Sequence, residues 1–316
     1  MKRGSAVPAE AIFALCCSLS FGACLIARAD VCGEAVRGAV DLCLRTLIPS
    51  LFPFLVLNGV FLGAGGVSLA AGTLGGVFSR VFRVPASLCA PFFIGLTAGF
   101  PSGAAAVARV YGDGGCSKDD AERALAFSSN AGPAFAIGGI GAMLGGPRLG
   151  GLIWAAQVLS SVILALLIAR IKPKRGEEPG RAAADPVSPP EPGVFVRAVK
   201  GAVYPMLCIC AFVLVFAPVT ALIGRGLEAA GLPALARAVV LSAVELTNGA
   251  AFAASSLPAP LAAAVCAFGL SWSGLCVCAQ TASCVSDAGL SLRYYLPGKL
   301  FSGLLSAALV LLALSL

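Results

Sequence analysis

Four long apolar stretches of this chain are interrupted near their middle by residues that break helices. The interruptions are 99–103 (GFPSG), 128–133 (SSNAGP), 245–249 (ELTNG) and 271–274 (SWSG). In hydrocarbon each unpaired backbone N–H or C=O costs several kcal/mol, so irregular backbone is stable only inside protein or beside a water-filled cavity. Broken helices in corresponding positions of two halves point to the substrate site of a transporter. The pattern therefore predicts a membrane transporter rather than a soluble enzyme.

The composition also predicts a protein whose surface is surrounded by lipid. The chain is 59% hydrophobic and 12% charged, whereas soluble domains carry about 25% charged residues. Its apolar runs are long enough to cross a hydrocarbon core of about 30 Å. We therefore expect an all-α polytopic protein of the cell membrane, in bacterial terms the inner membrane.

The net charge of +7 is concentrated in few places. Lys2 and Arg3 lead the chain, and five further basic residues lie between Arg170 and Arg181. Lysine and arginine flank membrane helices on the cytoplasmic side. This distribution favours membrane topology over nucleic-acid binding, because no aromatic-interleaved basic face accompanies it.

The expected organisation has two transmembrane halves, 1–171 and 193–316, joined by a Pro- and charge-rich cytoplasmic linker at 172–192. The first helix should span about 8–29. We expect it to be retained, since its apolar run is longer than the 7–15 residues of a signal peptide.

Further spans follow from hydrophobic run length. A helix at 30–62 should kink near Pro49 and Pro53, because proline lacks the backbone N–H, and 63–84 should form a Gly-rich surface segment. Ser117 should cap a short amphipathic helix that begins with acids. The remaining expected spans are broken at 84–111 and 127–144, continuous at 149–171 and 194–223, broken at 235–256 and 260–287, and continuous at 296–316.

The two halves resemble each other weakly. The segment 35–40 (AVRGAV) precedes a Pro-containing apolar helix, and so does 195–203 (FVRAVKGAV). If the N-terminus and linker are both cytoplasmic, these two helices run in opposite directions. Such halves form an inverted repeat, which brings two sets of broken helices together at the membrane midplane.

Glu245 is the sharpest candidate site residue, as the only carboxylate between Val239 and Leu257. Acids inside membranes cost at least about 2.5 kcal/mol on insertion scales and mostly mark ion or substrate paths. Two readings stay open: the carboxylate binds a solute or ion, or it caps a helix. The other candidate binding residues are polar side chains that either satisfy freed backbone groups or face a cavity. They are Thr247, Asn248, Ser128, Ser129, Asn130, Ser102 and Gln280.

Glycines and prolines are expected to form the breaks themselves and to expose backbone N–H groups, which attract anions at half-helix N-termini. They are Gly99, Pro101, Gly103, Gly132, Pro133, Gly249 and Gly274.

No catalytic residue, metal site or cofactor is predicted. The chain has 13 cysteines but no histidine and no Cys-x-x-Cys, so the usual zinc or haem spacings are missing. Nucleophile-elbow, P-loop and Rossmann motifs are also missing from the sequence.

The broken segments resemble the sporulation integral membrane protein YlbJ family, which carries a nucleoside recognition or Gate domain. The resemblance rests on 49–54 (PSLFPF), 95–104 (GLTAGFPSGA), 126–135 (AFSSNAGPAF), 245–249 (ELTNG) and 273–275 (SGL) with Gln280. It implies a Gate-like repeat at 35–171, a distant similarity to concentrative nucleoside transporters, and a location that extends to the forespore membrane. Members of the family are associated with movement of dipicolinic acid during sporulation.

The leading hypothesis is a permease for a small anionic or nucleoside-like solute, coupled to H⁺ or Na⁺. The alternative is a non-transporting membrane scaffold or assembly factor in sporulation, whose breaks serve packing alone. The expected partners are the solute, the coupling ion and the lipid bilayer, with no nucleic acid; oligomers are compatible with either hypothesis.

Overall fold

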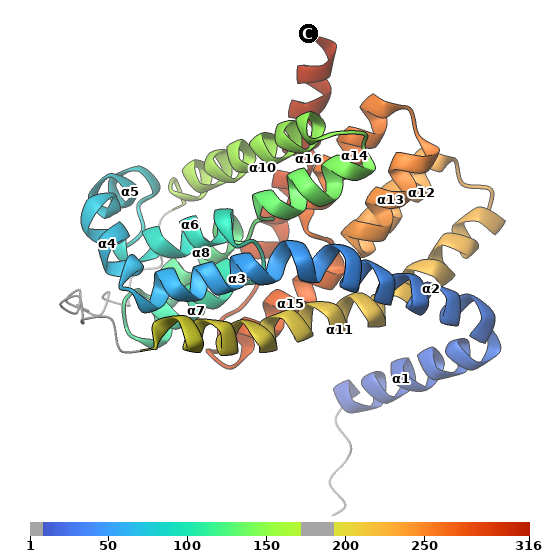
Figure 1. The fold of residues 1–316 in the computed structure, drawn as a ribbon, viewed down its shortest axis with the longest axis horizontal. Coiled ribbons are helices and arrows are strands. Elements are labelled where there is room, and N and C mark those ends of the chain that lie inside the picture. Colours follow the sequence, from blue (N-terminus) through green and yellow to red (C-terminus); the bar gives the residue numbers. More distant parts are fainter. Residues whose placement is uncertain (1–8, 172–192) are drawn as a thin grey trace, which may run out of the picture.

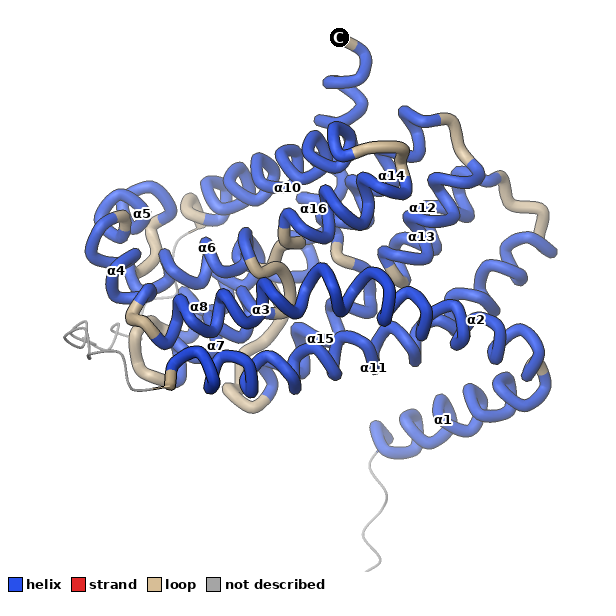
Figure 2. The backbone as a smooth tube through the Cα atoms, viewed as in Figure 1, coloured by secondary structure: helices blue, strands red, loops and turns tan. Residues whose placement is uncertain are grey.

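The computed structural model describes residues 9–171 and 193–316. Its described part consists of helices and connecting loops, without strands (Figure 2). The expected linker 172–192 and the basic residues Lys2 and Arg3 lie outside the described residues.

The N-terminal segment is helical, and it bends where the sequence predicts a kink. Helix α1 spans Ala9–Ala27 and lies apart from the main body (Figure 1). Helix α2 (Ala29–Leu42) continues through a π-helical turn at Cys43–Leu47 into α3 (Ile48–Gly63). The axis bends by 51° between 29–47 and 51–61. The bend falls at Pro49, where a backbone donor is missing.

The Gly-rich segment expected at the surface instead forms two short helices, α4 (Gly66–Thr73) and α5 (Gly75–Phe82). The chain then bends by 103° and enters the segment 86–97. Phe78 and Phe82 of α5 pack against Phe92, and Phe82 also against Phe127, with ring centroids 5.8–5.9 Å apart. This aromatic cluster fixes α5 against the interrupted helices that follow.

The interrupted helices of the first half fill the centre of the fold. Ser117 caps the third of them, because its hydroxyl accepts a bond from the Asp120 N–H at 3.2 Å. This confirms the expected cap. The elements are the 3₁₀ turn η2 (Ala86–Leu88), α6 (Cys89–Thr97), α7 (Ser102–Gly112), α8 (Lys118–Ser128), the π-helix η3 (Ala134–Ile140), α9 (Gly141–Met143) and α10 (Pro147–Ile168).

The remaining part of the chain begins with a helix longer than expected. Helix α11 (Val194–Ala229) runs for 36 residues, with Pro205 and Pro218 inside it. It is followed by α12 (Ala234–Val244), α13 (Leu246–Ser256), α14 (Ala259–Trp272), α15 (Gly274–Ser286) and α16 (Tyr295–Ser315).

Four to six of these segments are long and apolar enough to cross a membrane. Four are single segments, Pro147–Ile168, Val194–Ala229, Ala259–Ser286 (which includes the interruption at Ser273) and Tyr295–Ser315, and the two bent pairs at 29–61 and 75–97 add the others. Large apolar side chains such as Leu207 and Leu304 are exposed along them, as expected for surfaces solvated by lipid. The chain is an all-α multi-pass membrane protein with discontinuous helices.

Helices α3 and α11 lie side by side and run antiparallel (Figure 1). Gly59 of α3 faces Ala198 of α11. Gly63, one turn further along α3, faces Val194, which lies one turn earlier on α11. A Cβ added at Gly59 would lie 2.9 Å from the Ala198 Cβ, so the small residues allow close approach. The antiparallel direction is the one that an inverted repeat requires of these two helices.

Candidate functional site

The first two interruptions contact each other. Helices α6 and α7 form a hairpin whose glycines lie against the end of α8. A Cβ added at Gly95 would lie 1.7 Å from the Ser128 carbonyl oxygen, and a Cβ added at Gly103 would lie 2.0 Å from the same oxygen. At the hairpin tip, Gly99 has a positive φ of 83°. A Cβ there would lie 2.8 Å from the Gly132 nitrogen. Glycine is therefore required both for close packing and for the turn.

The third and fourth interruptions contact each other in the same way. Helices α12 and α13 form a tight hairpin around Glu245, and Trp272 Nε1 donates to the Ala243 carbonyl at 2.9 Å. Gly274, with a positive φ of 72°, lies against this hairpin: its Cβ would be 3.2 Å from the Val244 oxygen.

Two predicted break residues lie inside helices. Gly249 was expected at an interruption, but it lies inside α13. A Cβ at Gly249 would lie 2.3 Å from the Ser242 Cα on α12. The glycine therefore serves the close packing of the two hairpin arms, and the helix is interrupted at Glu245 instead. Gly103 likewise lies inside its helix, as the second residue of α7.

The first three interruptions, and the helix that follows the fourth, border one partly open space, which we call the break cavity. Gly99 and Phe100 come from the first, Ala131 and Gly132 from the second, and Glu245, Leu246 and Thr247 from the third; Cys276, Val277 and Gln280 follow the fourth on α15. The outer wall is apolar and consists of Leu47, Leu51, Phe135, Ile209 and Val213.

The break cavity is small in this conformation. Its water-accessible volume is about 40 Å³, and one water needs roughly 10–15 Å³ on this measure. It therefore has room for a few waters or an ion, whereas pockets for drug-sized ligands have about 300–1,000 Å³. A larger solute requires the hairpins to separate.

Glu245 is 2% exposed and uses both carboxylate oxygens to cap α13. Oε1 accepts the Thr247 N–H at 3.0 Å, and Oε2 accepts the Asn248 N–H at 2.7 Å. The helix dipole also favours a negative charge at this end. The carboxylate that caps α13 also lines the break cavity. Its position is therefore compatible with both hypotheses for Glu245, the helix cap and the binding group.

Of three further predicted residues, two line the break cavity and one bonds a neighbouring helix. Thr247 and Gln280 line the break cavity, and Gln280 Nε2 lies 3.5 Å from the Cys276 sulfur. Asn248 instead donates from Nδ2 to the Thr220 hydroxyl of α11 at 3.3 Å. It therefore links the hairpin to α11.

Asn130 is held by the protein at the second interruption. Its Nδ2 donates to the Phe127 carbonyl at 2.7 Å, and its Oδ1 accepts the Ser161 hydroxyl at 2.6 Å. Gln157 of α10 bonds both backbone groups of Ala131, at 3.2 Å and 3.0 Å. These bonds satisfy backbone freed by the interruption. Sequence reasoning missed Gln157, although a lone amide in an apolar helix is the same signal that drew attention to Gln280.

The remaining predicted residues surround the interruptions without lining the break cavity. Ser102 is half-buried, and its N–H donates to the Gly99 carbonyl at 3.0 Å. Ser128 and Ser129 are buried, with hydroxyls that have no hydrogen-bond partner among the described residues. Pro101 precedes α7, and Pro133 precedes η3.

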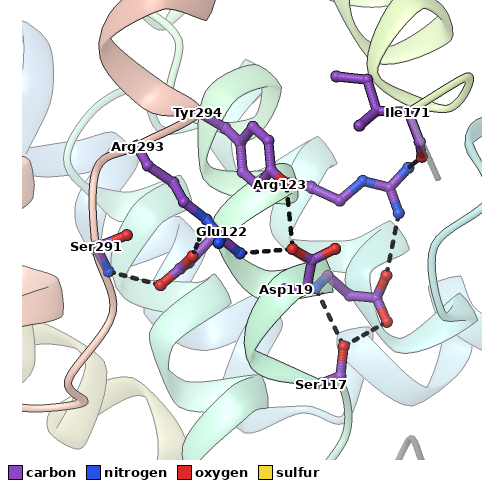
Figure 3. A network of polar contacts seen from close by, with 9 residues as sticks. Ser117, Asp119, Glu122, Arg123, Ile171, Ser291, Arg293 and Tyr294 are labelled. Carbon is purple, nitrogen blue, oxygen red and sulfur yellow. Dashed lines mark hydrogen bonds and ion pairs between the residues drawn. The ribbon is translucent and has the colours of Figure 1, made fainter. Parts of the chain in front are cut away.

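A buried charge network that the sequence analysis missed lies at the other end of α8 (Figure 3). Arg293 lies between two carboxylates, 2.5 Å from Asp119 Oδ1 and 2.6 Å from Glu122 Oε2. The Tyr294 hydroxyl also donates to Asp119, and the Ser291 N–H donates to Glu122 at 2.9 Å. The loop before α16 is thereby tied to α8.

The same turn of α8 holds the end of α10. Arg123 is 1% exposed, and its Nη2 donates to the Ile168 carbonyl at 2.8 Å. Ile168 is the last residue of α10, where a cation interacts favourably with the helix dipole. Arg123 and Arg293 together fix α8 between α10 and the start of α16.

We expect Arg293→Ala to lower the free energy of unfolding by about 3 kcal/mol, because removing one partner leaves buried charges unpaired. Thermal unfolding of the detergent-purified protein measures the effect. Arg109→Ala is the matched control: Arg109 and Asp113 are 76% and 73% exposed, and such pairs contribute about 0–1 kcal/mol. Equal stability of the two variants would contradict the structural role of the network.

Metal-ligating side chains do not gather within 9–171 and 193–316: these residues contain no group of three or more His, Cys, Asp or Glu that could hold a metal ion.

The chain is similar to the sporulation integral membrane protein YlbJ of Bacillus subtilis (strain 168). The two are 27% identical over 145 residues, which make up 46% of this chain and 36% of that protein. The name of that protein describes an integral membrane protein and no enzymatic reaction. No protein-family model and no solved structure matches the chain. The expected resemblance is thus supported over part of the chain, and its Gate-domain and nucleoside-transporter aspects stay predictions.

Proposed function

We propose that this protein is a permease that binds a small solute in the break cavity. The observation that carries the proposal is the meeting of interrupted helices from 89–140 and from 234–286 around one space that contains a carboxylate. Interrupted helices offer backbone groups to a solute, and in transporters they are found where the two halves meet.

The cavity also weighs against the scaffold hypothesis. Interruptions that serve packing alone are expected to be filled with side chains, because protein interiors are close-packed. Here the interruptions border free volume, and the buried polar groups Glu245, Thr247 and Gln280 line it. The carboxylate that caps α13 also faces this free volume, and acids inside membranes mostly mark ion or substrate paths.

For the solute, we propose an anionic or nucleoside-like small molecule. A nucleoside-like solute carries hydroxyl and amide groups that can bond Glu245 and Gln280 directly. An anionic solute would share the break cavity with the Glu245 carboxylate, so its entry would require a proton on that group. Proton-coupled uptake is therefore the form of coupling that this site fits for an anion, since the chain has no histidine to carry the proton.

Similarity to YlbJ favours a role in sporulation and makes dipicolinic acid the first anion to test. Uptake of labelled dipicolinic acid, and separately of uridine, should be measured in proteoliposomes with and without an inward proton gradient. We expect uptake of one probe above that of protein-free liposomes. Uptake of neither probe under any gradient would contradict the proposed solute class and favour the scaffold.

The proposed division into halves 1–171 and 193–316 has its own test. We expect a unique cysteine introduced into 172–192 of a cysteine-free variant to react only with reagents that reach the cytoplasm, because Lys and Arg flank membrane helices on that side. A cysteine introduced at the loop residue Gly231 is the comparison position. Labelling of 172–192 from outside intact cells would contradict the inverted repeat.

A further inference from the structure

Lys299 is a buried cation away from the break cavity. It lies on α16, is 1% exposed, and does not line the cavity. Its Nζ donates a hydrogen bond to the backbone carbonyl of Ser129. Among the described residues, no carboxylate lies within 4.0 Å of it. An ammonium without an acidic partner in such a place needs another source of stabilisation.

The position of the Ser129 carbonyl supplies one. Ser129 is the C-cap of α8, directly before the interruption. The end of a helix carries partial negative charge on carbonyl groups that have no intrahelical partner. In transporters with broken helices, half-helix C-terminal ends and unwound carbonyls are the groups that coordinate Na⁺.

Three further oxygen atoms lie on the two segments that Lys299 joins. They are the hydroxyls of Ser128 and Ser129 at the end of α8 and of Ser302, one turn after Lys299 on α16, and all three are buried and without hydrogen-bond partners among the described residues. Carbonyl and hydroxyl oxygens are hard donors of the kind that bind small cations.

The ionisable side chains near Lys299 are a thiol and a phenol rather than carboxylates. Cys278 of α15 is a neighbour of Lys299, and Tyr295 lies one turn before it on α16. The Tyr295 hydroxyl lies 3.2 Å from that of Thr281. The other helices packed against α16 are α8, α10 and α14, and their acids belong to the network around Arg293 at the far end of α8.

We propose that the Lys299 ammonium is a tethered cation that occupies an alkali-cation site at the C-terminal end of α8. The consequence for ion use, that transport proceeds without sodium, rests on the proposed function. The claim that Lys299 occupies the site does not depend on transport. It is tested through thermal stability, so a negative result for this claim is distinguishable from a failure to find transport.

The experiment is thermal unfolding of the detergent-purified full chain in NaCl or in choline chloride at equal ionic strength. The wild-type protein should unfold at the same temperature in both salts. Lys299→Ala should unfold at a lower temperature in choline, and NaCl should raise that temperature by several degrees in a saturable manner, because a ligand of the native state stabilises it. Lys200→Ala, which removes an exposed lysine of α11, should show neither change.

Lys299→Ser is the second variant if Lys299→Ala does not fold, because its hydroxyl can itself contact the cation. It should show the same saturable rise in NaCl. A folded Lys299 variant that unfolds at the same temperature in both salts would overturn the proposal. So would a wild-type protein that NaCl stabilises, since the site would then be free to bind sodium while Lys299 is present.

Discussion

Glu245→Gln is expected to lower solute uptake by at least about tenfold, which corresponds to about 1.4 kcal/mol of lost binding. The substitution keeps the shape of the side chain in the break cavity and removes its charge. The amide cannot carry a coupling proton, and it offers a bound solute one neutral acceptor oxygen in place of two charged ones.

Glu245→Gln is also expected to lower stability, because it disturbs the hydrogen bonds that cap α13. Both Glu245 oxygens accept backbone N–H groups, whereas glutamine has one acceptor oxygen and an NH₂ group that donates. One N–H of the first turn of α13 therefore loses its partner, which costs about 1–3 kcal/mol. A lowered unfolding temperature in a protein that is still folded is thus expected in addition to the loss of uptake.

The measurement is initial uptake in proteoliposomes, with whichever of dipicolinic acid and uridine the wild-type protein accumulates. Glu228→Gln is the matched control, because Glu228 is a 64% exposed carboxylate paired with Arg237 on the outside of the fold. Wild-type uptake by Glu245→Gln, with equal insensitivity to proton and sodium gradients, would reduce Glu245 to a helix cap. The solute site would then be sought at the backbone of Gly99 and Gly132.

The positions of the interruptions could be predicted from the sequence because glycine, proline and short polar residues act locally. A positive φ at glycine ends a helix locally, and proline removes a backbone donor, although Pro205 and Pro218 show that a helix can continue through a single proline. The distinction between an interruption and a packing glycine is not local. Gly249 was misplaced for this reason: its role depends on Ser242, which approaches it only when α12 and α13 fold back on each other.

Long-range polar contacts could not be predicted from one sequence. Lys299 and the Ser129 carbonyl are 170 residues apart, and Arg293 and Asp119 are 174 residues apart. Each of these side chains looks like an ordinary charge near a helix end, where lysine and arginine usually reach toward water. Only the packing of α16 against α8 shows that Lys299 and Asp119 are buried and which groups they and Arg293 bond.

Gly103→Ala is expected to lower the free energy of unfolding by about 3 kcal/mol or more, since overpacking a tight site costs about 1–3 kcal/mol and occasionally more. The added Cβ would lie 2.0 Å from the Ser128 carbonyl oxygen and 2.8 Å from the Gly95 Cα. Both neighbours are backbone atoms, so no side chain can rotate away to relieve the contact. The α6–α7 hairpin would have to move off the end of α8, and the break cavity would lose the wall formed by Gly99.

Gly112→Ala on the same helix is the matched control, because no atom lies within 4 Å of a Cβ at that position. Alanine favours helix over glycine by up to about 1 kcal/mol, so this variant should be as stable as the wild type or slightly more so. Thermal unfolding in detergent compares the three proteins, and uptake is measured on any that fold. If Gly103→Ala matches Gly112→Ala in stability, the hairpin does not rest on the Ser128 carbonyl. The meeting of the first and second interruptions, on which the proposed site depends, would then be wrong.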